Sequence, residues 1–540
     1  MIHIKFNNKQ FGESFESEAG FVTGTAFTKD GQKLSGKPLM DHLATFEEAA
    51  DLASSLPGLN GFYAFVVNNG NHLFAAVDRI RSIPIFYGNK GQDLFVSDDA
   101  RWVREQISDV EMDPLAREEF LLTGYVTGQD TLSPGVKQVQ AGELVSFQQD
   151  PHGKIRIEQR RYYRYLHTDY FHASEDELHQ KLDKVLVNIF NRLITYADGR
   201  TIVVPLSGGY DSRLIVLMLK RMGYENVVAF SYGRAGNHEA EISKKVAESL
   251  GIRWEFVEYS NDLWREWYES LEMKAYFDMA GNLASLPHIQ DWPAVKVLQQ
   301  QGRIPNNSIF VPGHSADLPA GSRSKSVPDL YNSKGSTERL IDAIIGYHYN
   351  LFDWSKKKRE LFPFFEKKIL EVLGDLDQYP DQSSAFESWD ISERQPKFIV
   401  NSLRVYEFFG YDWWIPFWDK EFMDYWCRIS PEKRLNQSLY IKFVDNLAKE
   451  RGVVIQEKET MGFFSIKKLI SIAKRVLPEE IKNWLRTKKR LHSYKNDPMG
   501  WYGIHDDKYV LEQIRDGASM INSLLAVDYI NELHGRKTQD

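Results

Sequence analysis

The sequence predicts two domains: an α+β domain on antiparallel β-sheet, then an α/β domain with a doubly wound parallel sheet and a helical extension. At 540 residues the chain exceeds one ordinary core, since domains run to about 100–200 residues. Its first third carries short strand-like runs joined by turn residues, whereas apolar runs alternate with helical patterns after residue 200. The hydrophobic fraction of 42% and the charged fraction of 26% are typical of a globular protein.

The first domain is expected to span residues 1–165. Its strand-like runs are rich in aromatic and β-branched residues and lie at 61–67, 72–77, 84–87 and 93–97. Asparagine and glycine at 68–70 and 89–91 supply hairpin turns. Helical patches at 46–55 and 114–122 complete an α+β pattern.

The second domain is expected to span residues 175–540. A helical pattern at 175–197 follows Ser174, which suits an N-cap. Apolar runs then alternate with helical patterns, the runs lying at 201–206, 226–231 and 254–258. Such alternation implies right-handed crossovers and a parallel sheet. The remainder is largely helical, with loops expected at 305–327 and 431–437.

Composition limits the compartment and the partners. The net charge of -8 gives no global attraction for nucleic acid, so no nucleic-acid partner is expected. The single cysteine, Cys427, excludes an internal disulfide framework and a thiolate-rich metal site; we expect a buried bystander. The start lacks signal-peptide features, and no apolar run approaches the ~20 residues that span a bilayer. These features predict a cytoplasmic protein.

A glycine-rich turn at 207–212, Ser-Gly-Gly-Tyr-Asp-Ser, follows the first apolar run of the second domain. Such a strand-to-helix turn aims backbone N–H groups and a helix N-terminus at one place, which suits a phosphate. It lacks the Gly-Lys-Ser/Thr of a Walker loop and does not read Gly-x-Gly-x-x-Gly. The competing interpretation is a tight turn without a ligand.

A second loop supplies another carboxylate. The apolar run at 309–312 leads into Gly313, His314 and Asp317. Ligands of open α/β sheets bind where such strands end. Asp211 would repel bound phosphates unless Mg²⁺ lay between them, and Mg²⁺ prefers carboxylate, phosphate and water oxygens. Asp211 and Asp317 are therefore the predicted metal ligands, with Mg²⁺ and ATP as cofactors.

Several segments in this order resemble the asparagine synthetase family. The turn at 207–212 is similar to its pyrophosphatase loop, 313–317 to its Gly-Glu-Gly-Ala-Asp loop, and 410–424 to its Gly-Val-Glu-x-Arg-Val-Pro-Phe-Leu-Asp segment. In the first domain, 61–65, 76–79, 84–87 and 120–125 also follow the family order. The resemblance implies an Ntn-type β-sheet sandwich, similar to class II amidotransferases, and a PP-loop synthetase domain. It implies these ATP and pyrophosphate ligands: Leu206, Ser207, Gly208, Gly209, Asp211, Ser212, Tyr232 and Gly313.

The family obtains ammonia from glutamine with an N-terminal cysteine, and this chain departs from that pattern. Ile2 follows Met1, and the family's glutamine-site motifs are missing from the first sixty residues. Because that hydrolysis requires a thiolate, the first domain is predicted to be an inactive glutaminase-like domain.

Two further departures concern catalytic residues. His314 stands where the family has glutamate and β-lactam synthetases have tyrosine; it is predicted to accept a proton from an amine, or only to hydrogen-bond its loop. The family's catalytic lysine corresponds to Lys458, two residues further from Gly462 than expected, with Lys442 as the next candidate. Glu239 is interpreted as a residue near the ribose or as a first-turn acidic residue.

The resemblance implies an ATP-dependent amide-forming synthetase that activates a carboxylate as its adenylate and passes it to ammonia or an amine. The alternatives are an ammonia-using asparagine synthetase, a tRNA-modifying relative and a non-catalytic partner protein. The basic residues within 466–490 allow two interpretations. The segment could contact a membrane or an acidic carrier, or it could be a solvated amphipathic helix. The sequence is also compatible with a homodimer. It is compatible as well with an aromatic or sugar-like substrate that binds near Trp413.

Overall fold

Two β-sheets form the first part of the chain, which confirms the predicted α+β class. The computed structural model describes residues 1–7, 13–70, 72–150, 152–332, 336–453 and 479–535. The smaller sheet contains, in spatial order, β1 (Ile2–Lys5), β8 (Asp93–Ser97), β7 (Phe86–Lys90) and β9 (Lys137–Gln138). The larger sheet contains β11 (Ile155–Arg161), β10 (Glu143–Gln149), β6 (His72–Val77), β5 (Asn60–Asn69), β3 (Gly20–Phe27) and β2 (Phe15–Ser17), with β4 (Lys33–Ser35) on β3.

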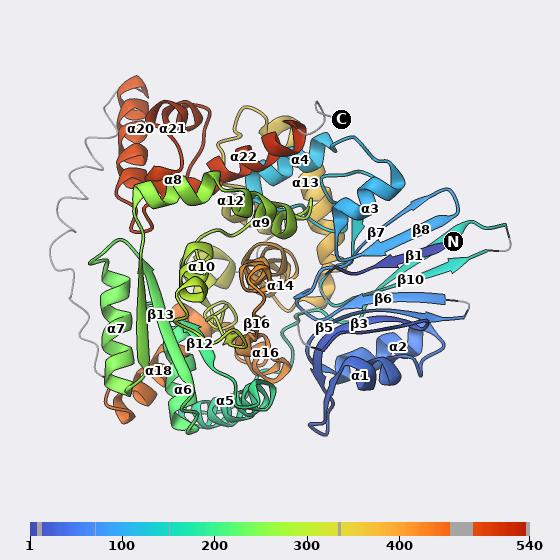
Figure 1. The fold of residues 1–540 in the computed structure, drawn as a ribbon, viewed down its shortest axis with the longest axis horizontal. Coiled ribbons are helices and arrows are strands. Elements are labelled where there is room, and N and C mark those ends of the chain that lie inside the picture. Colours follow the sequence, from blue (N-terminus) through green and yellow to red (C-terminus); the bar gives the residue numbers. More distant parts are fainter. Residues whose placement is uncertain (8–12, 71, 151, 333–335, 454–478, 536–540) are drawn as a thin grey trace.

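The central strands of the larger sheet are buried on both faces. Val22, Phe65 and Phe74 on one face pack in a core with helices α1 (Gly36–Leu43) and α2 (Ala49–Ser55). The opposite face joins the smaller sheet in a second core. The further helices of this part are α3 (Ala100–Ile107), which contacts β7 and β8, and α4 (Pro114–Thr123). The layers are therefore helix, sheet, sheet and helix (Figure 1).

Two details differ from the expected antiparallel hairpins. The strand expected at 84–87 begins only at Phe86, because Pro84 has no N–H to donate to a ladder. β1 pairs in parallel with β8, with Ile4 beside Val96. The other strand pairs of both sheets are antiparallel.

A five-stranded parallel sheet forms the second part, as the alternating pattern predicted. Its spatial order is β14 (Arg253–Glu258), β13 (Val227–Gly233), β12 (Ile202–Pro205), β15 (Ile309–Phe310) and β16 (Asp412–Trp413). The chain moves outward from β12 in one direction and then returns to its other side with β15. The junction of β12 and β15 is therefore the topological switch point, where ligands of such sheets bind.

Helices cover the parallel sheet on both sides (Figure 1). One side carries α5 (Glu175–Ala197), α6 (Tyr210–Arg221), α7 (His238–Leu250) and α18 (Ser438–Glu450). Ser174 begins α5 with a capping box to Glu177, as its sequence predicted. The other helices are α8 (Asn261–Glu269), α9 (Leu271–Gly281), α10 (Trp292–Gln300), α11 (Pro328–Asn332), α12 (Thr337–His348), α13 (Lys358–Leu373), α14 (Gln382–Ser392), α15 (Arg404–Phe408), α16 (Lys420–Cys427), α17 (Pro431–Arg434), α20 (Glu479–Lys495), α21 (Asp507–Arg515) and α22 (Ile521–Gly535). None of the described helices has the length and apolar character needed to cross a membrane.

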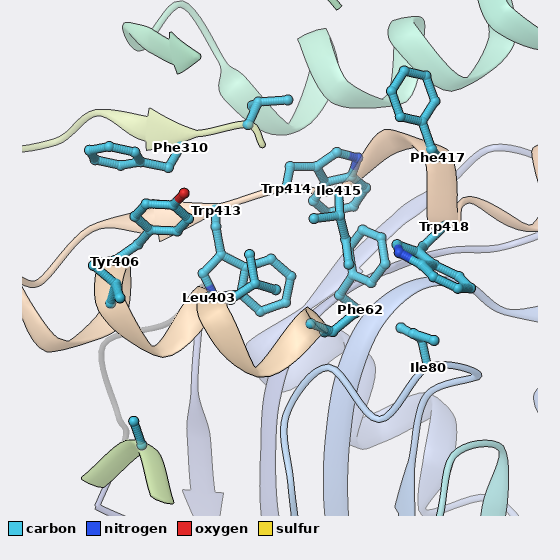
Figure 2. Packing of buried hydrophobic residues seen from close by; sticks show 14 of the residues in the cluster. Phe62, Ile80, Phe310, Leu403, Tyr406, Trp413, Trp414, Ile415, Phe417 and Trp418 are labelled. Carbon is cyan, nitrogen blue, oxygen red and sulfur yellow. The ribbon is translucent and has the colours of Figure 1, made fainter. Parts of the chain in front are cut away.

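Aromatic side chains join the two parts into one continuous core (Figure 2). Phe62 of β5 packs on Trp413 and Trp414, with ring centroids 5.6 and 4.7 Å apart. The Trp413 indole N–H also donates to Glu407 Oε1 at 2.8 Å. Trp413 is thus a buried core residue. The predicted domain boundaries at residues 165 and 175 stay a prediction, because apolar side chains of both parts pack into one core.

Helix α14 carries two carboxylates into the interior, where each meets a guanidinium. Glu387 Oε2 lies 2.6 Å from Arg434 Nη1 and 2.9 Å from His167 Nε2, and all three side chains are fully buried. Asp390 Oδ2 accepts a hydrogen bond from Arg323 Nε at 2.6 Å. Burial alone would raise the pKa of Glu387, but Arg434 and His167 outweigh it and lower that pKa to about 2.

We expect Glu387→Gln to lower the free energy of unfolding by about 3–5 kcal/mol, because it leaves the buried Arg434 charge unpaired. Calorimetric melting at pH 7 measures this, with the exposed Asp41→Asn of the Lys37–Asp41 pair as the control, expected to cost less than about 1 kcal/mol. The Glu387 contribution is full above its unfolded pKa of roughly 4.3 and is lost as the pH falls toward 2. A Glu387 variant with the same melting temperature as the control would contradict the stabilising role of the Glu387–Arg434 pair.

Candidate functional site

Two loops meet where β12 and β15 end. β12 pairs in parallel with β15, with Ile202 beside Ile309, so both loops leave the same sheet edge. Gly313 lies so close to the other loop that a Cβ atom there would sit 2.7 Å from the Ser212 backbone nitrogen. A side chain at 313 would separate the loops, so glycine is required here.

The loop at 207–212 is held by its own serines. The Ser207 backbone N–H donates to Ser212 Oγ at 3.1 Å, and the Gly209 N–H donates to Ser207 Oγ at 3.2 Å. Gly209 begins α6 without a side-chain cap. The first turn of α6 therefore presents backbone donors that suit an anion.

Glu239 has a role that neither sequence interpretation gave it. Its Oε2 accepts a hydrogen bond from the Gly208 N–H at 2.6 Å. A Cβ atom at Gly208 would lie 2.7 Å from the same oxygen. Glu239 thus fixes the phosphate loop from the start of α7, and its first-turn position alone did not reveal this contact.

Asp211 and Asp317 are neighbours, as predicted from two loops at one sheet edge. The Asp317 N–H donates to Asp211 Oδ2 at 3.2 Å, and the Tyr440 hydroxyl donates to Asp211 Oδ1 at 2.9 Å. Burial, and then repulsion by Asp317, raise the pKa of Asp211 well above its usual range. This excess negative charge and an all-oxygen donor set fit Mg²⁺. Within the described ranges, no cluster of three or more His, Cys, Asp or Glu could hold a metal by itself, so phosphate oxygens would complete the site.

A pocket of about 460 Å³ opens between these loops and β13. It is lined by Pro205, Ser207, Gly209, Tyr210, Asp211, Ser212, Tyr232, His288, Gln290, Asp291, Pro312, Gly313, His314, Asp317 and Gln437. Eight of the ten predicted ATP, metal and catalytic residues that the structure describes therefore line one cavity, Tyr232 and His314 among them, while Leu206 and Gly208 are not lining residues.

His314 lies in the pocket beside Ser402, with its Nε2 3.3 Å from the serine oxygen. Burial lowers the pKa of its imidazole to about 4. Its Nδ1 is buried and has no hydrogen-bond partner among the residues that the structure describes. The lowered pKa leaves the His314 imidazole neutral at pH 7, and its Nδ1 is a buried polar atom without a described partner.

The other predicted residues lie elsewhere or outside the description. Lys458 is outside the described residues. Lys442 is exposed and pairs with Glu175 at 2.9 Å, which makes it a surface charge. Cys427 is partly exposed, yet desolvation raises the pKa of its thiol, which makes it a poor nucleophile.

Within 466–490 only the part in α20 is described. Ile481, Trp484 and Leu485 are exposed there, while Leu491 and Tyr494 of the same helix are buried. Contact of this segment with a membrane or carrier stays a prediction.

Gln290 and Asp291 line the pocket although nothing in the sequence indicated them, and both contact the predicted Tyr232. Tyr232 donates from its hydroxyl to Asp291 Oδ1 at 2.5 Å, and Tyr406 donates to Asp291 Oδ2 at 2.8 Å. Gln290 Nε2 donates to the Tyr232 hydroxyl at 3.1 Å. These residues come from β13, α15 and the approach to α10, and only the fold brings them together. The Tyr232 side chain is thus engaged with Asp291.

Comparisons with known proteins found similarity in both parts of the chain. Residues 43–163 match the glutamine amidotransferase domain family, and residues 201–280 match the family of queuosine biosynthesis protein QueC. Asparagine synthetase [glutamine-hydrolyzing] 1 of Bacillus subtilis is 26% identical over 219 residues, which cover 39% of this chain and 32% of that protein. Microcin J25-processing protein McjC of Escherichia coli is 21% identical over 309 residues, covering 56% of this chain and 55% of McjC. The NH3-dependent NAD synthetase from Campylobacter jejuni superposes with a TM-score of 0.20 at 14% identity, covering 40% of this chain and 94% of that structure.

The first part of the chain is therefore similar to amidotransferase domains over residues 43–163, and the part with the parallel sheet is similar to QueC over residues 201–280. Over part of its length the chain is also similar to an asparagine synthetase and to McjC. It spans about a third to just over half of the length of the two curated relatives.

We expect Asp211→Asn to raise the free energy of unfolding of the nucleotide-free protein by roughly 1–2 kcal/mol, because it removes repulsion between two neighbouring carboxylates. The pKa of Asp211 is raised in the folded state, so the gain over wild type should grow as the pH rises above its unfolded value of about 3.9. Melting curves from pH 4 to 8 measure this, with Asp41→Asn again as the control. An Asp211 variant that melts below wild type throughout would contradict the repulsion.

Proposed function

We propose that the chain is an ATP-dependent synthetase that activates a carboxylate as its acyl-adenylate, releases pyrophosphate and transfers the acyl group to ammonia or an amine. The observation that carries the proposal is the meeting of Asp211, Asp317 and an uncapped helix N-terminus in one pocket at the switch point. Asp211 and Asp317 would hold Mg²⁺, which when bound neutralises charge on the departing pyrophosphate.

The protein's own groups explain the remaining chemistry. Backbone donors of 207–212 orient the phosphates, and Glu239 and Arg213 keep that loop in place through Gly208, Arg213 donating to the Gly208 carbonyl at 2.8 Å. Positioning and charge neutralisation supply most of the rate in phosphoryl chemistry. Lys458 is the proposed source of a further positive charge, as the family resemblance implies.

The resemblance to the family would imply glutamine hydrolysis, but the chain offers no nucleophile for it. The matched amidotransferase region contains no cysteine, since the single one is Cys427. We therefore propose that nitrogen comes from ammonia or from a substrate amine, without glutamine hydrolysis by this chain.

An ammonia-using asparagine synthetase is the second candidate, and the charge of the pocket disfavours it. Aspartate would bring a second carboxylate into a site already lined by Asp211, Asp291 and Asp317. The described lining residues include no lysine or arginine to pair with it. A non-catalytic partner protein would have no use for the buried Asp211–Asp317 repulsion.

Pyrophosphate release with ATP and Mg²⁺ tests the activity across L-aspartate, L-glutamate, N-acetyl amino acids and short peptide acids, each with ammonium chloride or methylamine. With any active pair, Asp317→Asn should lower the rate at least 100-fold, because one ligand of the proposed metal is lost. The control is Asp198→Asn, at the exposed C-cap of α5, which should keep wild-type activity. Survival of activity in Asp317→Asn would refute the metal assignment, and no release with any pair would refute the activity.

Glutamine should support product formation no better than its contaminating ammonia does, because the first 165 residues contain no thiol. The measurement compares amide formation at equal concentrations of glutamine and ammonium chloride, together with glutamate release. Glutamate released in step with the amide would overturn the proposal.

A further inference from the structure

The pocket contains an acid–imidazole pair that phosphate chemistry does not require. His288 Nε2 lies 3.4 Å from Asp291 Oδ1. Asp291 occupies the N-cap position of α10, but its side chain makes no capping hydrogen bond. An aspartate at this position ordinarily accepts from the helix N–H groups. Here its carboxylate is directed to the pocket side chains instead.

Three side chains hold the Asp291 carboxylate in place. Tyr232 and Tyr406 donate to its two oxygens at 2.5 and 2.8 Å, and His288 lies at the first of these oxygens. Burial alone would raise the pKa of Asp291, but the contacts with His288, Tyr232 and Tyr406 outweigh it and keep that pKa low. The carboxylate is therefore ionised and immobile, which suits the orientation of an imidazole.

His288 is the partly open member of this network. About a third of its side chain is exposed, and it lines the same cavity as Gly313 and Asp317. The nearby His314 has a pKa of about 4, which makes it a weak proton acceptor at neutral pH. The titratable groups that face His288 are Asp291 from α10, Tyr232 from β13, Tyr406 from α15 and His314 from the loop after β15.

We propose that His288 accepts the proton that an amine nucleophile loses as it attacks the acyl-adenylate, and that Asp291 is the positioning residue that orients His288. This inference rests on the proposed function. The nitrogen lone pair forms the C–N bond, the N–H proton passes to His288 Nδ1, and Nε2–H stays directed to Asp291. The C–O bond to the phosphate then breaks, and AMP leaves with its electron pair.

The charge of the pocket favours the same class of nucleophile. Asp211, Asp291 and Asp317 line it, and no lysine or arginine is among its described lining residues. An amine reaches the site largely as a cation, which three carboxylates attract. The cation must first lose one proton to solvent to free its lone pair, and the neutral amine then loses a second proton as the C–N bond forms. A proton acceptor beside Asp291 can take this second proton.

The test separates the two half-reactions of the enzyme. Exchange of labelled pyrophosphate into ATP, with the carboxylates named above and no amine, reports adenylate formation. Single-turnover amide formation with methylamine reports the second step. We expect His288→Gln to keep exchange within about threefold of wild type and to slow amide formation by about 100- to 1,000-fold. Asp291→Asn should keep exchange and slow amide formation by at least about tenfold.

Two comparisons exclude a merely structural effect. His152→Gln changes an exposed histidine of the first domain and should match wild type in both steps. Added imidazole should restore amide formation in His288→Gly by at least tenfold, because it replaces the missing base.

The outcomes separate this inference from the proposed function. Wild type without exchange for any carboxylate defeats the proposed function, and the inference with it. If the wild type shows exchange, two results for His288→Gln would defeat the inference alone. One is an equal loss of both steps, and the other is unchanged amide formation.

Discussion

The site depends on the parallel pairing of β12 with β15 and the close approach that follows from it. With Ile202 beside Ile309, the two strands end together, and the Gly313 backbone comes against the backbone of Ser212. One carboxylate then enters from each loop. A side chain at position 313 would push the two loops apart and separate Asp211 from Asp317.

This arrangement places two carboxylates side by side, whereas each of the two buried carboxylates of α14 is paired with a guanidinium. Glu387 meets Arg434, and Asp390 meets Arg323, each at 2.6 Å. Asp211 instead accepts hydrogen bonds from the Tyr440 hydroxyl and the Asp317 N–H, and it lies beside a second carboxylate. Two neighbouring carboxylates repel each other in the free protein, and the proposed Mg²⁺ would relieve that repulsion. The contrast distinguishes a binding site from a structural ion pair.

Local sequence patterns predicted the elements and the phosphate loop, while long-range contacts could not be read from them. The helix at 175–197 and the strands at 72–77 and 93–97 were found with these bounds, because periodicity and capping are local properties. Asp211 and Asp317 were paired correctly because strand ends of a parallel sheet meet at one edge. Nothing in the sequence indicated Asp291 as a pocket residue, because an aspartate before a helix is typical of an N-cap. Its contacts with Tyr232 and Tyr406 depend on the tertiary fold. Glu239 lies in the first turn of α7, as one interpretation expected, but its contact with the Gly208 N–H depends on the tertiary fold.

The first domain packs against the strands of the second part of the chain. It has no thiol for glutamine hydrolysis, yet its β5 supplies Phe62 to the rings of Trp413 and Trp414, and Asn60 donates to Asp419 at 3.0 Å. Burial of an indole removes about 150–250 Å² of surface from water, worth several kcal/mol for each ring at roughly 25 cal/mol per Å². Trp413 belongs to β16, which pairs with β15, the strand that leads to Gly313. Without the first domain, these rings would face water at the sheet edge that carries the site. The first part of the chain therefore supports, through the packing of Phe62 on Trp413, the strands that lead to the pocket.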